Sequence, residues 1–227
     1  MDLQVVDRQP PARAARADTA RRTKSERTKE SVLAAAEVLF SERGFDATTL
    51  DAIGERAGMQ GTAILYHYAS KRALYEAVLD RMFTPMWDDV HRLLEADRPV
   101  NERFAAVTRT MVRFAAARPA AARLVLREAS AGSAEAGDIV GSASQRQWVR
   151  FIDALGSGVD QAATVDFDPR VVWNIVIGAI CFNFGTGSFA GNRSNATSDP
   201  ARVARFEAVM VDLTHSLCRL GGERHDA

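Results

Sequence analysis

The segment Thr48–Lys71 constrains the fold of this chain more than any other part of the sequence. Its first half places apolar residues at the three- and four-residue spacing of one helix face: Leu50, Ile53 and Ala57. Gly58 stands where a left-handed residue ends a helix, and a second short helix follows with Ile64 and Tyr68 pointing inward. The segment therefore predicts a helix-turn-helix.

Polar residues are positioned to cap these helices. Thr48 or Thr49 caps the first one, because a hydroxyl there accepts from a free backbone N–H of the opening turn. Ser70 caps a third and much longer helix, with Lys71 in its first turn. The caps define where each of the short helices begins.

Another helix is predicted ahead of this segment, from Ser25 to about Glu42. Its apolar stripe consists of Val32, Leu33, Ala36, Leu39 and Phe40. Gly44 ends the helix, and Phe45 turns back into the same small core.

The rest of the chain also follows helical spacing, and no β-alternation is present in the sequence. Pro85 falls inside the pattern of the long helix and is expected to kink or split it. We expect helices over residues 71–94, 101–117, 119–128, 138–159, 169–184 and 201–220. The predicted fold class is all-α.

The last two predicted helices carry more apolar surface than one subunit can easily cover. Helix 201–220 has a strict a/d seam: Val203, Phe206, Met210, Leu213, Leu217 and Leu220. Helix 169–184 is apolar nearly all round, so it has to bury a second face. We therefore expect a homodimer with a four-helix interface; a hairpin packed within one subunit is the alternative.

Composition is that of an ordinary globular protein, with 227 residues, 47% hydrophobic, 26% charged and a net charge of zero. Affinity for DNA would have to come from locally placed side chains. The sequence has no signal peptide and no apolar run long enough to span a bilayer, so we expect a cytoplasmic protein. Cys181 and Cys218 are expected to be buried apolar residues, with a disulfide or redox sensor as the alternative, and no metal or cofactor is expected.

From Arg27 to Leu74 the chain resembles the TetR family of bacterial transcriptional regulators. The resemblance rests on pieces in order: a helix ending LF-x-x-x-GF, the TT-x-x-x-I turn, AG, YHY-x-SK and the following Leu74. It implies a DNA-binding domain over residues 25–72 and a helical ligand-binding and dimerisation domain over residues 73–222.

An arm at residues 1–24 precedes these two domains. It is polar, with Pro10–Pro11 and scattered arginines, so we expect it to be disordered. Either it touches the minor groove or the phosphates of DNA, or it is a solvated tail with no role.

The second short helix is predicted to read bases in the major groove with its N-terminal residues. By position, the residues expected to face the bases are Gln60, Gly61, Thr62 and Ala63. Gln60 suits adenine, Ala63 suits a thymine methyl, and Gly61 would let the backbone approach closely.

The resemblance further implies contacts to the DNA phosphates from Tyr66, His67 and Lys71, with Thr49 added from a helix N-terminus. Packing between helices is the alternative for Tyr66 and His67. Ala63 stands where the family often has threonine, and Leu65 where tyrosine is nearly standard. The operator preference therefore cannot be taken from relatives.

A small-molecule pocket inside the second domain is also implied by the resemblance. Its candidate residues are Trp87, Met111, Phe114, Trp148, Phe151, Trp173, Asn174 and Phe182. As a set they predict a mainly apolar ligand with few polar anchors, although each residue alone is better explained by core packing. Asn174 stands out because a buried amide needs hydrogen-bond partners.

The implied function is a repressor that leaves a palindromic operator when a small ligand binds. An activator and a ligand-independent DNA-binding protein are the alternatives. An enzyme is not expected, because the sequence lacks G-x-S-x-G, H-E-x-x-H and Walker motifs. The run GTGSFAG at residues 185–191 has the wrong spacing for a dinucleotide site.

Overall fold

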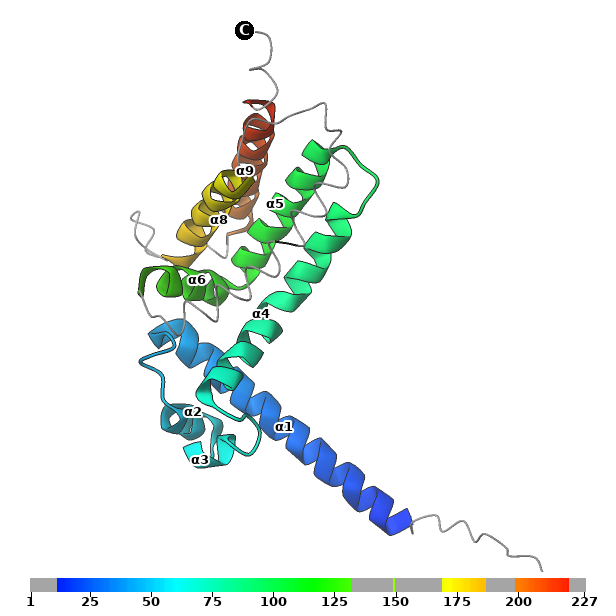
Figure 1. The fold of residues 1–227 in the computed structure, drawn as a ribbon, viewed down its shortest axis with the longest axis vertical. Helices are drawn as coiled ribbons and strands as arrows, with labels where there is room; N and C mark the ends of the chain where they lie inside the picture. The colour runs from blue at the N-terminus through cyan, green and yellow to red at the C-terminus, as the bar shows by residue number, and fades with distance from the viewer. Residues whose placement is uncertain (1–11, 132–148, 150–168, 187–198, 221–227) are drawn as a thin grey trace, which may run out of the picture.

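The computed structural model describes residues 12–131, 149, 169–186 and 199–220. All regular structure in these residues is α-helical, which confirms the predicted fold class (Figure 1). The helices are α1 (Ala12–Arg43), α2 (Leu50–Ala57), α3 (Gly61–Ile64), α4 (Lys71–Leu94), α5 (Val100–Ala117), α6 (Pro119–Ala131), α8 (Pro169–Gly185) and α9 (Pro200–Leu220). The helix expected over residues 138–159 lies outside the described residues, apart from the helical Val149.

α1 begins earlier than the sequence analysis predicts. Residues 12–24, expected to belong to a disordered arm, are helical and extend α1 away from the other helices (Figure 1). The expectation was wrong for these residues because alanine and arginine, which dominate the stretch, are strong helix formers even without a packed face. Residues 1–11 lie outside the described part of the chain.

Two apolar cores share the long helix α4. Its first half, from Leu74 to Met82, packs with α1, α2 and α3, and its second half, from Met86 to Leu94, packs with α5, α8 and α9. Phe83 contacts both cores. α4 is continuous through Pro85, so the proline does not split the helix. One continuous helix therefore takes part in both cores.

Three aromatic rings form the centre of the N-terminal core. Phe40, Phe45 and Tyr75 are fully buried, with ring centroids 4.8 Å apart for Phe40–Tyr75 and 5.0 Å apart for Phe45–Tyr75. Edge-on and tilted contacts of this kind add to the stabilisation from burial alone. The core is small, but three large side chains fill its centre.

α6 lies against the C-terminal end of α1 and connects the two cores. A carboxylate oxygen of Glu128, which is buried, accepts a hydrogen bond from the backbone N–H of Phe45 at 3.2 Å. That N–H directly follows Gly44, whose φ of 81° ends α1 as predicted. Burial and the neighbouring Glu128 carboxylate raise the pKa of the Tyr75 hydroxyl far above its usual value.

The bundle consists of α4, α5, α8 and α9 in the described residues. The a/d seam of α9 packs inside the subunit: Val203, Phe206, Met210, Leu213 and Leu217 all contact the core formed with α5 and α8. Thr108 of α5 and Thr214 of α9 pair inside it at 3.0 Å. The seam therefore packs at least partly within the subunit, and the four-helix dimer interface expected from its spacing stays a prediction.

α8 has an inner and an outer face. The inner face buries Val176, Ile180, Cys181 and Phe184. Burial raises the pKa of the Cys181 thiol to about 11, as expected for a buried apolar cysteine; the side chain of Cys218 lies outside the described residues. Within the described helices, α8 included, none is both long and apolar enough to cross a membrane.

Candidate nucleic-acid interface

Two glycines determine how closely α2 and α3 pack. A Cβ on Gly54 would lie 2.7 Å from the backbone N of Gly61 and from the carbonyl of Met59. A Cβ on Gly61 would overlap a carboxylate oxygen of Asp51 and lie 2.8 Å from its Cα. Gly61 is thus buried against α2. Its missing side chain admits the neighbouring helix, which does not fit the base-facing position expected from the sequence.

The ends of α2 are built as the sequence predicts. Thr49, and not Thr48, is the N-cap: its hydroxyl oxygen accepts from the N–H of Ala52 at 3.1 Å. Thr48 is buried instead, and its hydroxyl contacts the carbonyls of Leu39 and Gly44. Because Thr49 is exposed and uses only its acceptor in the cap, its O–H remains available to a phosphate.

One side of α3 is open to solvent. Gln60, the N-cap residue, has an exposed side chain that makes no capping hydrogen bond, and Thr62 and Ala63 are also exposed. On the other side, Ile64 is completely buried and holds the helix in the core. The structure thus brings together three of the four residues predicted to face bases.

Tyr66 follows α3 and is 88% exposed, an unusual position for a large aromatic side chain. Its ring meets that of the half-buried His67 edge-on, with centroids 5.4 Å apart. Leu65 is also exposed, at 47%. Packing between helices, the alternative considered for Tyr66, therefore does not account for its position.

Lys71 has an internal contact that the sequence analysis missed. Its ammonium group donates to the backbone carbonyl of Phe45 at 3.0 Å and lies 4.2 Å from the centroid of the Phe45 ring. It thus connects the first turn of α4, which Ser70 caps through the N–H of Ala73 at 3.0 Å, to the loop after α1. An ammonium has three donors, so Lys71 can still reach a phosphate.

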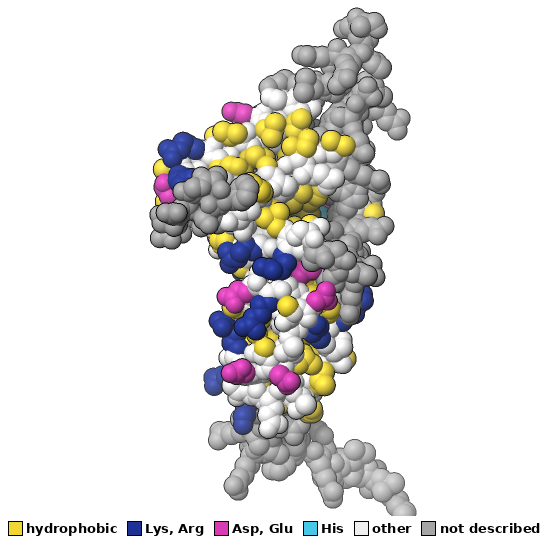
Figure 2. Space-filling model, turned by 90° about the vertical axis from the view of Figure 1, so that its left-hand side faces the viewer, with side chains coloured by type: hydrophobic (Ala, Val, Ile, Leu, Met, Phe, Trp, Pro, Cys, Tyr) yellow, Lys and Arg dark blue, Asp and Glu magenta, His cyan; other side chains and the backbone are white. Residues whose placement is uncertain are grey.

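Charge on this part of the molecule is mixed. On the face shown in Figure 2, Lys and Arg side chains over the lower half of the molecule are interspersed with Asp and Glu. This agrees with the net charge of zero. Binding through this domain would depend on the placement of a few donors, since this face carries no unbroken basic surface.

The segment that contains α2 and α3 is similar in sequence to known proteins. Residues 32–78 match the family model of the bacterial regulatory proteins of the tetR family. This segment of the chain is therefore similar to the N-terminal part of tetR-family regulators. The resemblance proposed from the sequence is confirmed there.

Curated relatives match the same region. The transcriptional regulator RutR of Escherichia coli K12 is 46% identical over 59 residues, which is 26% of this chain and 27% of RutR. The transcriptional repressor BepR of Brucella suis biovar 1 is 35% identical over 81 residues, or 35% of this chain and 39% of BepR. The matches therefore span well under half the length of these relatives.

The fold similarity extends further along the chain. The transcriptional regulator FadR of Bacillus subtilis, solved in complex with stearoyl-CoA, has a TM-score of 0.61 over 86% of this chain and 97% of its own. Sequence identity to it is only 14%, so the similarity establishes a shared fold. The helices after α4 thus share the fold of the corresponding part of that regulator.

Four of the predicted ligand residues lie along the inside of this second domain. Met111 is buried, whereas Trp87, Phe114 and Trp173 are half-buried. The rings of Trp87 and Trp173 stack with centroids 5.6 Å apart, and Phe114 meets Phe83 at 5.7 Å. Trp148 and Phe151 lie outside the described residues.

Asn174 and Phe182 do not belong to this set. Asn174 is exposed and Phe182 is 48% exposed, both on the outer face of α8. The prediction of a buried Asn174 amide was wrong, because the helix buries Val176 and Ile180 and thereby turns residue 174 outward. Neither residue faces the interior of the bundle.

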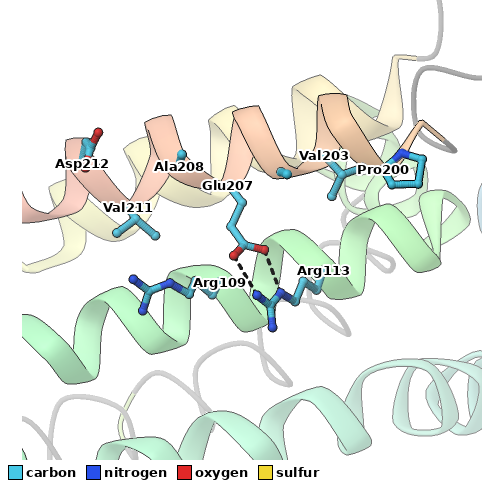
Figure 3. A pocket seen from close by; sticks show the side chains of 9 residues that line it. Arg109, Arg113, Pro200, Val203, Glu207, Ala208, Val211 and Asp212 are labelled. Carbon is cyan, nitrogen blue, oxygen red and sulfur yellow. Dashed lines mark hydrogen bonds and ion pairs between the residues drawn. The ribbon is translucent and has the colours of Figure 1, made fainter.

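A surface groove of about 630 Å³ runs between α5 and α9 and contains none of the predicted ligand residues (Figure 3). Arg113 spans it and binds the carboxylate of Glu207 through two hydrogen bonds of 2.7 and 2.8 Å. Arg109 and Asp212 line its sides. Its opposite charges balance, so the groove favours no charged ligand.

Two buried polar residues of the bundle, His91 and Arg103, were missed in the sequence analysis. His91 stacks on Trp87, with centroids 6.1 Å apart. Helical spacing from Trp87 would have placed His91 on the same face, but burial of Arg103 could not be read from a helix start that is otherwise polar.

Proposed function

We propose that this protein is a homodimeric transcriptional repressor that binds a palindromic operator in the cytoplasm and leaves it when a small, mainly apolar ligand binds. The observation that carries the proposal is that α3 has one buried side and one solvent-exposed side. Ile64 and Gly61 hold the helix against the core, while Gln60, Thr62 and Ala63 project from its N-terminal turn. A recognition helix presents its residues to base edges in this way.

Specific roles follow for the exposed residues. Gln60 pairs with an adenine edge, Thr62 is adaptable, and Ala63 contacts a thymine methyl. The residues that position the helix on phosphates are Thr49, Tyr66, His67 and Lys71. Since phosphate contacts carry no sequence information, specificity rests on the first three.

Dimerisation is supported by the outer face of α8 and the adjacent surface of α9. Val171, Ile175 and Phe182 form an exposed apolar stripe on α8, and Val209 of α9 is 63% exposed. Figure 2 shows hydrophobic side chains gathered over the upper part of the molecule. Apolar surface of this extent on α8 and α9 favours burial against a second copy, which would give two α3 helices for two half-sites.

Repression is favoured over activation by the relatives, since BepR is named a repressor. A ligand that binds the interior of the bundle would act through α4, which belongs to both cores. It relieves repression if it binds the DNA-incompetent state more tightly. FadR, solved with stearoyl-CoA, supports an apolar effector, as do the half-buried aromatic residues.

Fluorescence anisotropy on DNA from upstream of the protein's own gene tests the proposal. We expect binding at least about a thousandfold tighter than to a scrambled duplex, measured over a salt series. Equal and weak binding to both would require a selection from random DNA, and failure to enrich a sequence there would reject a sequence-specific regulator.

Variants of α3 and of the apolar surface on α8 and α9 distinguish base recognition from dimerisation. Gln60→Ala should change the enriched sequence without changing the dimer. Ile175→Glu should produce a monomer by light scattering and weaken operator binding, because a carboxylate cannot be buried in an apolar interface. Val209→Glu extends the test to α9, and an exposed control, Asp80→Lys on α4, should leave the dimer intact.

A further inference from the structure

Arg103 is a buried cation close to the junction of α4 and α5. This junction lies at the end of the bundle far from α3 (Figure 1). Arg103 lies in the first turns of α5 and is only 7% exposed. One terminal N–H donates to the carbonyl of Leu94, the last residue of α4, at 2.8 Å. The buried Nε has no hydrogen-bond partner, and no acidic side chain of the described residues forms an ion pair with Arg103.

Capping of α4 does not account for the whole of this side chain. A guanidinium has five N–H donors and a full positive charge, whereas Leu94 offers a single carbonyl at a helix end that carries a partial negative charge. Buried charges in proteins are normally paired, because an uncompensated one is costly. Arg103 therefore retains the capacity to bind an anion.

Aromatic side chains line one face of α4 in the turns before Leu94, whose carbonyl accepts from Arg103. Trp87, His91 and Leu94 are spaced by four and three residues, so they share one face over about 10 Å of helix. Trp87 stacks both on the buried His91 and on Trp173 of α8, with interplanar angles of 24° and 20°. Both tryptophans are half-buried, so part of each ring system stays accessible.

We propose that Arg103 binds an anionic group of the effector, a carboxylate or a group of similar shape, while a flat aromatic body of the effector packs against Trp87 and Trp173. This inference rests on the proposed function and specifies its ligand class as a planar aromatic acid. Arginine suits the anionic end because its planar fork matches a carboxylate with two parallel hydrogen bonds.

A matched pair of probes tests the charge requirement: 2-naphthoate and 2-naphthalenemethanol, which share the ring system and differ in charge. Their affinities for the full chain would be measured by calorimetry, with quenching of tryptophan fluorescence as a second readout. We expect 2-naphthoate to bind at least about tenfold more tightly, since a hydrogen bond to a charged group accounts for such a factor.

Variants assign this preference to one side chain. Arg103→Gln, which keeps a donor for Leu94 but removes the charge, should bring the affinity ratio of the probes close to one. Arg103→Lys should retain part of the preference. Arg113→Gln is the matched control on the same helix, because Arg113 is exposed and bound to Glu207, and it should leave the ratio unchanged.

Three outcomes would overturn the inference: equal affinity of both probes for the unaltered protein, no binding of either at millimolar concentration, or an unchanged ratio in Arg103→Gln. An unchanged ratio together with a lower melting temperature of Arg103→Gln would indicate that Arg103 serves only to cap α4. If Arg103→Gln does not fold, the affinity ratio of the probes is compared between the unaltered protein and Arg103→Lys.

Anisotropy on operator DNA tests the proposed function separately. Specific operator binding without a preference for naphthoate would reject only the anion site. A preference for naphthoate without specific operator binding would reject only the function as a regulator.

Discussion

The two cores that share α4 are packed differently. In the N-terminal core, Phe40, Phe45 and Tyr75 are fully buried and contact one another. In the bundle, Trp87 and Trp173 stack but stay half-exposed. The comparison teaches that the aromatic rings of the core behind α3 are completely buried, whereas the aromatic rings inside the bundle keep some accessible surface.

The largest effect is expected from Gly61→Val in the tightly packed region. The added side chain would collide with the backbone of Asp51, so α2 and α3 could not keep their contact. We expect a loss of about 3 kcal/mol or more in the free energy of unfolding, together with loss of specific DNA binding. Urea denaturation and anisotropy measure the two.

Gly178→Ala is the matched change in the other region. A Cβ there meets nothing within 4 Å in the subunit, and alanine is the better helix former, so the subunit should be stabilised by up to about 1 kcal/mol. If Gly61→Val were tolerated as well as Gly178→Ala, the contrast between the two regions would be wrong.

Glu128→Ala tests the connection between the cores. It removes the acceptor of the Phe45 N–H and leaves that buried group unpaired, which should cost about 2–3 kcal/mol in urea denaturation. Glu128→Gln retains an acceptor and should cost less. Equal losses for both variants would show that the carboxylate charge, and not the hydrogen bond, is what matters.

The pH dependence of the free energy of unfolding tests how well the bundle buries Cys181. The pKa of Cys181 is raised from 9.0 to about 11 by burial, so the folded state holds the thiol proton more tightly than the unfolded state. The stability contributed by the protonated thiol is complete below pH 9 and is lost as pH rises through about 11, by roughly 3 kcal/mol. Cys181→Ala should remove this part of the alkaline decline; an unchanged profile would mean that other groups, such as Tyr75, account for it.

The smallest effect is expected from Lys71→Met. Loss of the hydrogen bond to the Phe45 carbonyl and of the cation–π contact should cost about 1 kcal/mol. If Lys71 also binds phosphate, affinity for every duplex should fall alike and the salt dependence should decrease by about one ion. A stability loss with unchanged DNA affinity would assign Lys71 to the fold alone.

Local sequence determined much of the N-terminal domain. Capping by Thr49 and Ser70, the left-handed Gly58 and the buried Ile64 each depend on residues within a few positions, so motif and spacing predicted them correctly. The family resemblance belongs to the same stretch, because the groups that position α3 are close together in the chain. The extension of α1 to Ala12 is also local, since it reflects helix propensity, but low hydrophobicity argued more strongly for disorder.

Tertiary structure alone decided which neighbour each face meets. Periodicity places residues on a common face, yet it does not say whether that face packs within the subunit, as the seam of α9 does, or stays outside, as Asn174 does. Gly61 turned inward because α2 approaches it, and Glu128 meets the Phe45 N–H across 83 positions of chain. Such contacts are decided by packing between distant segments, so no short-range pattern in the sequence encodes them.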